Sequence, residues 1–278
     1  MNEKNSVLGG VGVLVTRPLK QARLFAKRLE TFGTVPIVFP TIEIAPPQDV
    51  RPLLEARAGL GTYDFVMFVS ANAVEQALTT LPHWPKNVMA LAPGRGTAAA
   101  LRQAGVPDQL VLTSTSSFDS EGLLALPALQ QMQGKRVLIL RGERGRELLG
   151  EMLAARGAEV TRVTCYRRIC PSHSAANEAD ILWSLLQQNR LHAITLTASE
   201  ALDNLETMAG EALCQALKAL PVFTIHPRIT EHARARGWQA VDTRSDDGNS
   251  NNGSDEGLIC GMIAFFSSHD FSVIQTTA

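Results

Sequence analysis

The sequence has almost no net charge, few aromatic residues and no long apolar run. Its 278 residues include 26 Lys and Arg against 27 Asp and Glu, so no overall field favours nucleic acid or an anionic membrane. The longest apolar stretches, such as DFVMFV, are too short to span a bilayer. The opening stretch MNEKNSVLGG lacks the apolar segment of a signal peptide. We therefore expect a cytoplasmic protein without a nucleic-acid or membrane partner.

Motifs for common nucleophiles, metals and nucleotides are also missing. The sequence contains no G-x-S-x-G, H-E-x-x-H or P-loop pattern. The GGVG stretch at residues 9–12 precedes a predicted strand instead of following one, so it is not a dinucleotide fingerprint. None of the four cysteines forms a C-x-x-C pair or lies near a histidine cluster. We expect them to be free thiols of a reducing compartment.

What the sequence does have is a regular alternation of short β-branched runs and longer helical stretches. VGVLVT at residues 11–16 predicts a buried strand, and the helix predicted after it has Pro18 near its first turn and Gly33 after its last. The same succession starts again near residues 65, 88, 136, 193 and 222. This pattern predicts an α/β fold with parallel sheets flanked by helices, and the length favours about two domains.

Several segments occur twice in the same order. The stretch ALAPGRGTAAALRQAGV and the later VFTIHPRITEHARARGW share one plan: an apolar run, a turn with proline, a helical Ala/Arg segment and a glycine. The matching positions are Arg17 and Arg141, Val74 and Leu202, Gly105 and Gly237, and Glu121 and Glu256. The period is too long for a solenoid repeat, so the sequence predicts two similar domains.

Small and hydroxyl-bearing residues follow many of the predicted strands. Parallel sheets bind ligands at the carboxyl ends of their strands, and helix N-termini offer free N–H groups to carboxylates and phosphates. The turns are Thr16-Arg17, Ser70-Ala71-Asn72, Gly94-Arg95-Gly96-Thr97, Arg141-Gly142 and Thr197-Ala198-Ser199. They indicate an anion-binding cleft. The alternative is that these side chains are ordinary helix caps and turn residues.

Taken together, these motifs resemble those of the uroporphyrinogen-III synthase family. The resemblance rests on VLVTRP, YDFVMFVSANAV, GRGTAAAL, SEGLL, RVLILRGERGRELL and CYRR. It covers residues 11–261 except the polar run at 243–257, which we expect to be a flexible loop. It implies two similar flavodoxin-like domains joined by a two-stranded antiparallel connector, with the active site between them. Domain 1 would comprise 1–35 and 172–278, domain 2 40–164, and the connector 36–39 and 165–171.

The family's reaction is the dehydration and cyclisation of hydroxymethylbilane, a linear tetrapyrrole rich in carboxylates. Ring D is inverted on closure, and the product is uroporphyrinogen III. The resemblance therefore implies a cyclising hydro-lyase of porphyrin and heme biosynthesis that uses no metal or cofactor. It also implies a monomer that acts on this small molecule and makes transient contact with the upstream hydroxymethylbilane synthase.

The resemblance places the site residues on the turns. Tyr166 matches the family's connector tyrosine and is the expected catalytic group, because a phenol can donate a proton or hydrogen bond to the leaving hydroxyl. Its alternative is packing at the domain junction. The expected substrate-binding residues are Arg17, Ser70, Asn72, Gly94, Gly96, Thr97, Arg141, Gly142, Arg146, Thr197 and Ser199. For the three arginines, ion pairing within the protein is the alternative.

The second copy departs from the family pattern. His226 replaces the usual glycine, Ala198 replaces a serine, and Ile229 stands where a threonine is expected, with Thr230 one place late. We expect His226 to be a turn residue and not an acid. The same fold also suits a non-catalytic, hinge-closing sensor of an anionic metabolite, although the sequence shows no effector segment. A nucleotide-binding flavodoxin-like protein is disfavoured by the missing phosphate loop and by the 5% aromatic content.

Overall fold

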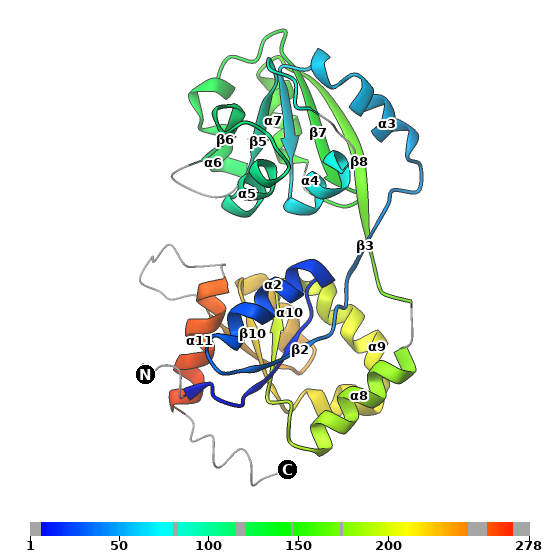
Figure 1. Ribbon diagram of the computed structural model, residues 1–278, viewed down its shortest axis with the longest axis vertical. Coiled ribbons are helices and arrows are strands. Elements are labelled where there is room, and N and C mark those ends of the chain that lie inside the picture. The colour runs from blue at the N-terminus through cyan, green and yellow to red at the C-terminus, as the bar shows by residue number, and fades with distance from the viewer. Residues whose placement is uncertain are drawn as a thin grey trace. The chain divides into compact units, whose positions relative to one another are not determined.

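The computed structural model describes residues 7–79, 83–114, 120–145, 147–172, 175–243 and 255–268. The chain divides into two compact units (Figure 1). Unit 1 contains residues 1–43 and 169–278, and unit 2 contains residues 44–168. Within the described ranges, no helix combines the length and the apolar character that crossing a membrane requires.

Unit 1 is built on a five-stranded sheet with the order β11-β10-β9-β1-β2, in which neighbouring strands run parallel. The strands are β1 (Gly12–Val15), β2 (Val35–Val38), β9 (Ala193–Leu196), β10 (Pro221–Thr224) and β11 (Gln239–Asp242). Strands β1 and β9 are buried along their whole length, as expected for parallel strands covered by helices on both faces.

The helices of unit 1 are α2 (Leu19–Glu30), α8 (Ala175–Gln187), α9 (Ser199–Leu217), α10 (Pro227–Ala235) and α11 (Asp255–Ser268). Phe25 of α2 and Phe223 of β10 are completely buried and belong to one core cluster with apolar residues of α11. Gly210 interrupts α9, because its φ of 70° and ψ of 177° are not helical. Glycine adopts this positive φ at no steric cost.

Unit 2 is built on a six-stranded sheet with the order β3-β8-β7-β4-β5-β6. The pairs from β8 to β6 are parallel. The strands are β3 (Glu43–Ala45), β4 (Phe65–Phe68), β5 (Met89–Ala92), β6 (Val111–Thr113), β7 (Arg136–Gly142) and β8 (Glu159–Ile169).

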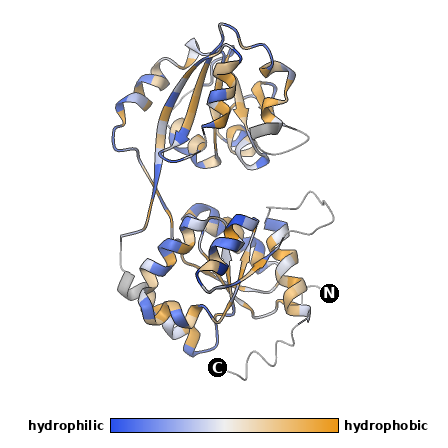
Figure 2. Ribbon diagram, turned by 180° about the vertical axis from the view of Figure 1, so that it is seen from behind, coloured by the Kyte–Doolittle hydropathy of each residue, from blue (hydrophilic) through white to orange (hydrophobic). Residues whose placement is uncertain are grey.

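The α-helices of unit 2 are α3 (Arg51–Ala58), α4 (Ala71–Leu78), α5 (Arg95–Gln103), α6 (Ser120–Leu124) and α7 (Leu148–Ala155). Three short 3₁₀ helices are η1 (Leu60–Thr62), η2 (Asp108–Leu110) and η3 (Pro127–Leu129). Alternate residues of β4 enter two different core clusters: Val66 and Phe68 join one, and Phe65 and Met67 the other. Both faces of the sheet are therefore covered, and Figure 2 shows the hydrophobic strands inside each unit.

The two sheets share one strand order. Reading β2-β1-β9-β10-β11 in unit 1 and β8-β7-β4-β5-β6 in unit 2 gives the same succession of parallel neighbours. In unit 1 this is the 2-1-3-4-5 order of doubly wound sheets, and in unit 2 the same arrangement reads 5-4-1-2-3 when the five parallel strands are numbered along the chain. The chain builds them in a different sequence, because unit 1 begins with the two strands that correspond to the last two of unit 2. The α/β fold with parallel sheets flanked by helices is confirmed.

The predicted connector segment at residues 36–39 is wrong. Val35–Val38 form β2, which pairs with β1 in parallel and belongs to the sheet of unit 1. An extended β-branched segment followed by proline is equally typical of an edge strand and of a connector, so only its pairing partner separates the two. The chain passes between the units at Glu43/Ile44, beyond the predicted segment 36–39, and at Arg168/Ile169, which lies inside the predicted segment 165–171.

The prediction that residues 243–257 form a flexible loop is wrong for residues 255–257. Residues 244–254 lie outside the described residues. Residues 255–257 form the first turn of α11 instead of a loop. Asp255 and Glu256 are acidic residues in that turn, where their charge interacts favourably with the helix dipole.

Candidate active site

The carboxyl ends of β4, β7 and β8 bring three of the predicted residues together in unit 2. Ser70 follows β4, Gly142 ends β7, and Tyr166 lies near the end of β8. The Ser70 Oγ and Tyr166 Oη atoms are 3.1 Å apart and hydrogen-bonded. β4 and β7 are the neighbours between which the strand order reverses, and doubly wound sheets bind their ligands at this position.

A β-bulge sets the position of Tyr166. Arg141 of β7 pairs with Thr164 of β8, but the next residue, Gly142, pairs with Tyr166 and not with Cys165. A Cβ atom on Gly142 would lie 2.8 Å from Tyr166 Cζ and 3.1 Å from its hydroxyl oxygen. The phenol ring therefore needs glycine at this position. Tyr166 is 7% exposed.

Ser70 is also the N-cap of α4, because its hydroxyl accepts a hydrogen bond from the Ala73 N–H at 3.2 Å. The capping alternative is thus correct for this residue, and the contact with Tyr166 is an additional role. Asn72 lies in the first turn of the same helix and is half-buried. No sequence motif predicted the contact between Ser70 and Tyr166, since the two residues are far apart in the chain and meet through the bulge.

The glycine turn before α5 offers backbone groups more than side chains. Gly94 is the N-cap of α5 and makes no side-chain cap, so the first N–H groups of the helix lack a partner within it. A Cβ on Gly96 would have nothing within 4 Å, so the space beside it is open. Thr97 is buried at 6% exposure. Its side chain packs into unit 2.

Arg141 is engaged within its own turn. Its Nε donates to the Gly142 carbonyl at 3.2 Å and its Nη2 to the Gly145 carbonyl at 3.0 Å. Its Nη1 pairs with the Glu147 carboxylate. This hydrogen bond is the main reason why the pKa of Glu147 lies below its usual value. For Arg141, ion pairing within the protein is what the structure shows. Arg146 lies outside the described residues.

Arg17 is also paired within its unit. Its Nη1 lies 2.5 Å from Asp255 Oδ1, and its guanidinium carbon lies 4.3 Å from the centre of the Phe25 ring. The side chain is 12% exposed. Because Asp255 opens α11, this pair fixes the start of that helix to the end of β1. The ion-pairing alternative is therefore observed for Arg17 too.

The remaining predicted turn lies in unit 1. Thr197 and Ser199 are half-buried at the start of α9, whose N-cap, Ala198, makes no side-chain cap. His226 caps α10, since its Nδ1 accepts from the Arg228 N–H at 3.1 Å. The expectation that His226 is a turn residue is confirmed. Thr230 is buried and hydrogen-bonded to Thr224 at 2.6 Å.

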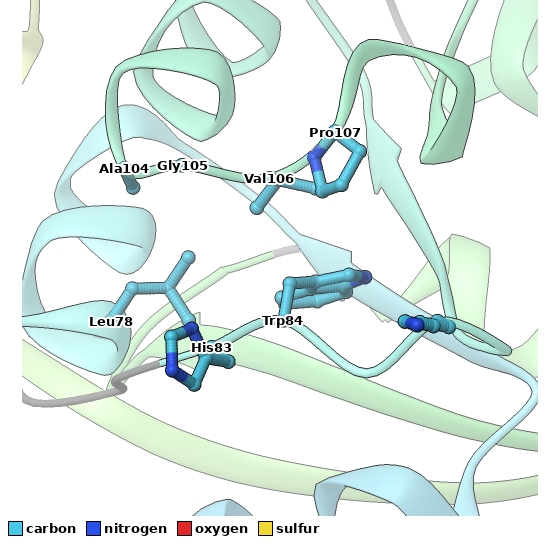
Figure 3. Close-up of a pocket in the computed structure, with 8 residues that line it drawn as sticks. Leu78, His83, Trp84, Ala104, Gly105, Val106 and Pro107 are labelled. Atoms are coloured by element: carbon cyan, nitrogen blue, oxygen red, sulfur yellow. The ribbon is translucent and has the colours of Figure 1, made fainter.

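Unit 2 also has a cavity of about 340 Å³ at the opposite ends of α4 and α5 from these turns (Figure 3). Its lining is Leu78, His83, Trp84, Lys86, Ala104, Gly105, Val106 and Pro107. The Trp84 indole lines it, and its N–H donates to the Val88 carbonyl at 2.8 Å. No sequence motif predicted this cavity. Within the described part of the chain, no three His, Cys, Asp or Glu side chains could together hold a metal ion.

The chain matches known proteins over most of its length. Residues 24–246 match the family described as Uroporphyrinogen-III synthase HemD. The uroporphyrinogen-III synthase of Escherichia coli (strain K12) is 36% identical over 236 residues, which cover 83% of this chain and 94% of that protein. The Synechococcus elongatus enzyme is 34% identical over 203 residues, with 70% and 73% covered.

Solved structures share the fold. The uroporphyrinogen III synthase of the extremely thermophilic bacterium Thermus thermophilus, in a mutant form, superposes with a TM-score of 0.52 at 21% identity, covering 93% of this chain and 98% of that one. The synthetase of Helicobacter pylori 26695 gives 0.51 at 16% identity, covering 93% and 100%. With the family match across most of the sequence and relatives above 30% identity, this chain belongs to the uroporphyrinogen-III synthase family.

Proposed function

We propose that this protein dehydrates and cyclises hydroxymethylbilane to uroporphyrinogen III, with inversion of ring D, as a hydro-lyase. The observation that carries the proposal is the 36% identity to the Escherichia coli enzyme over 94% of its length. Hydroxymethylbilane is reactive by itself and closes to the symmetric isomer I without an enzyme. The protein's task is therefore mainly geometric: it holds the chain so that the substituted carbon of ring D attacks first.

The turns supply carboxylate-binding groups in this proposal. The uncapped N-termini of α5 and α9 provide N–H groups at Gly94–Thr97 and Thr197–Ser199. The open space beside Gly96 allows close approach of a carboxylate to the backbone. Asn72 and Gly142 add polar groups at the ends of β4 and β7. Arg17 and Arg141 support these turns through their internal ion pairs.

Tyr166 is the proposed catalytic residue. Its phenol gives a proton to the hydroxyl of the substrate, the C–O bond breaks with its electron pair going to oxygen, and water leaves. The pyrrole nitrogen supplies electrons to the resulting azafulvene cation. The position of the phenol at the carboxyl ends of β4 and β7 supports this role. The N-terminus of α4 carries a partial positive charge and does not stabilise the azafulvene cation. In this proposal the carboxylates of the substrate itself balance the charge of that cation.

The proposal includes the finer features that the family resemblance implies. β3 and β8 are neighbours, and the chain crosses between the units within or beside them. This supports their assignment as the two-stranded antiparallel connector of two domains. A cytoplasmic monomer that receives its substrate by transient contact with hydroxymethylbilane synthase completes the proposal, and these points remain predictions.

Isomer analysis tests the function. Hydroxymethylbilane is generated in situ, the protein is added, the product is oxidised, and uroporphyrins I and III are separated by chromatography. We expect predominantly isomer III. Isomer I alone, formed at the spontaneous rate with folded protein present, would contradict the enzyme. The sensor alternative would then predict tetrapyrrole binding without turnover.

A further inference from the structure

The Ser70 hydroxyl connects a helix end to a phenol. Its oxygen accepts the Ala73 N–H at 3.2 Å, and it lies 3.1 Å from the Tyr166 oxygen. Within the described residues, Ser70 is the only side chain that hydrogen-bonds this phenol. Capping α4 requires only the contact with the Ala73 N–H, so the contact with the Tyr166 oxygen is additional. Binding a substrate carboxylate would require neither of these two protein contacts.

This double contact leaves the Ser70 hydroxyl proton available to the Tyr166 oxygen. Because the Ala73 N–H already occupies one lone pair of Ser70 Oγ, the hydroxyl proton of Ser70 can be directed at the phenol oxygen. Such a bond leaves the phenol's own proton free for another acceptor. It also places a donor, backed by the N-terminus of α4, against the oxygen that becomes negative when that proton is given away.

Gly142 restrains the same phenol from the side of the ring. A Cβ at this position would lie 2.8 Å from Cζ and 3.0 Å from Cε2 of Tyr166. The Tyr166 carbonyl also accepts the Glu143 N–H at 3.0 Å, which fixes the backbone on the other side of the bulge. Tyr166 is therefore hydrogen-bonded at its backbone and at its phenol oxygen, and Gly142 lies close beside its ring, so the phenol oxygen is held in one place.

We infer that Ser70 is a positioning residue that donates to the Tyr166 oxygen, aims the phenol proton at the leaving hydroxyl and stabilises the phenolate formed when that proton leaves. This inference rests on the proposed function and deepens it, because it assigns Ser70 to the chemical step and not to binding a substrate carboxylate. The proton balance is closed: the leaving water takes the phenol proton, and a proton released on ring closure restores the phenol.

The test compares Ser70→Gly, Ser70→Thr and Tyr166→Phe with the unmodified protein. Glycine caps a helix nearly as well as serine but has no hydroxyl, so Ser70→Gly removes the contact while keeping α4. We expect kcat to fall about tenfold with KM changed by less than about twofold. Ser70→Thr should restore most of kcat. Ser70→Gly combined with Tyr166→Phe should be no slower than Tyr166→Phe alone.

A spectroscopic measurement tests the hydrogen bond without turnover. The chain has two tyrosines, so labelling with ¹³Cζ-tyrosine gives two signals, and Tyr63→Phe assigns them. Ser70→Gly should shift the Tyr166 signal, Ser70→Thr should return it, and the Tyr63 signal should stay unchanged. Thermal unfolding of each variant verifies that unit 2 is folded.

The outcomes separate this inference from the proposed function. If the unmodified protein makes no isomer III, the proposed function fails and the role of Ser70 fails with it. If it makes isomer III, an unchanged kcat in Ser70→Gly overturns the inference alone. A raised KM with unchanged kcat, or losses that multiply in the double variant, assigns Ser70 to carboxylate binding instead. An unmoved ¹³Cζ signal removes the hydrogen bond itself.

Discussion

Gly96 follows β5 and Gly142 ends β7 in unit 2, but their surroundings differ. Nothing lies within 4 Å of a Cβ built on Gly96, whereas a Cβ on Gly142 would meet the Tyr166 ring at 2.8 Å. Gly96 is therefore not required by packing within the protein. Gly142 is required by the protein's own interior.

We predict that Gly96→Ala leaves the protein as stable as before or slightly more stable, because alanine is up to about 1 kcal/mol better than glycine in a helix. KM for hydroxymethylbilane should rise several-fold, since the new methyl group occupies the space that the proposed function gives to a carboxylate. Thermal unfolding and steady-state kinetics measure the two effects. An unchanged KM would remove the glycine turn from the binding site.

Gly142→Ala should behave in the opposite way. The methyl group must displace the Tyr166 ring, and overpacking of this kind costs about 1–3 kcal/mol. We expect a lower urea midpoint and a lower kcat together. Full stability with normal activity would show that the ring is free to move away from β7.

The cysteines of this chain should differ in reactivity. Burial raises the pKa of the Cys165 thiol to about 12, so it remains protonated at pH 8, and the thiolate is the reactive form. Cys260 is exposed. We predict that iodoacetamide labels Cys260 in the native protein and Cys165 only in urea. Peptide mass spectrometry identifies the labelled sites, and rapid native labelling of Cys165 would contradict its burial.

At the scale of elements, Asp64 joins the starts of β4 and β7. Its carboxylate accepts the Arg136 N–H at 2.9 Å and the Lys135 ammonium at 2.9 Å. The backbone hydrogen bond from Arg136, followed by that from Lys135, lowers the pKa of Asp64. A carboxyl group with a lowered folded-state pKa stabilises the fold above its unfolded pKa and loses this contribution as pH falls through the folded value.

Asp64→Asn should therefore reduce the free energy of unfolding at pH 7 by up to about 1 kcal/mol, since the group is partly exposed and solvent screens it. The difference from the unmodified protein should shrink as the pH falls below 4, where the carboxyl group of the unfolded chain is protonated. Urea denaturation at a series of pH values measures it. A difference that stays constant down to pH 2 would exclude the ionised carboxylate as its cause.

The elements themselves were largely predictable, because β-branched runs and helical stretches are local features. VGVLVT contains β1, and Pro18 and Gly33 flank α2 as expected. The same local reasoning could not separate β2 from a connector. Sheet membership depends on the partner strand, and β2 pairs with β1 across an intervening helix.

At the scale of the whole molecule, the two units differ in chain continuity. Unit 2 is one uninterrupted segment, residues 44–168, and two buried clusters cover its sheet. Unit 1 needs two distant segments, residues 1–43 and 169–278. A contiguous segment with its own core can fold alone.

We predict that a chain of residues 44–168 folds by itself, with an α/β circular dichroism spectrum and cooperative unfolding. Under the proposed function it forms no isomer III, because the turn at Thr197–Ser199 is absent. Dispersed amide signals by NMR verify the fold. A chain that is unfolded at every temperature would show that unit 2 depends on unit 1.

Local sequence alone specifies the alternation of strands and helices, the duplicated plan and the positions of the turns, because each depends on neighbouring residues. It also contained Tyr166 and Ser70 as separate candidates. Their contact is a product of folding, since a bulge in β8 and the pairing of β4 with β7 bring together residues 96 positions apart. The tertiary structure likewise decided that Arg17 and Arg141 are held by internal carboxylates, because ion pairs form between side chains that folding brings within reach.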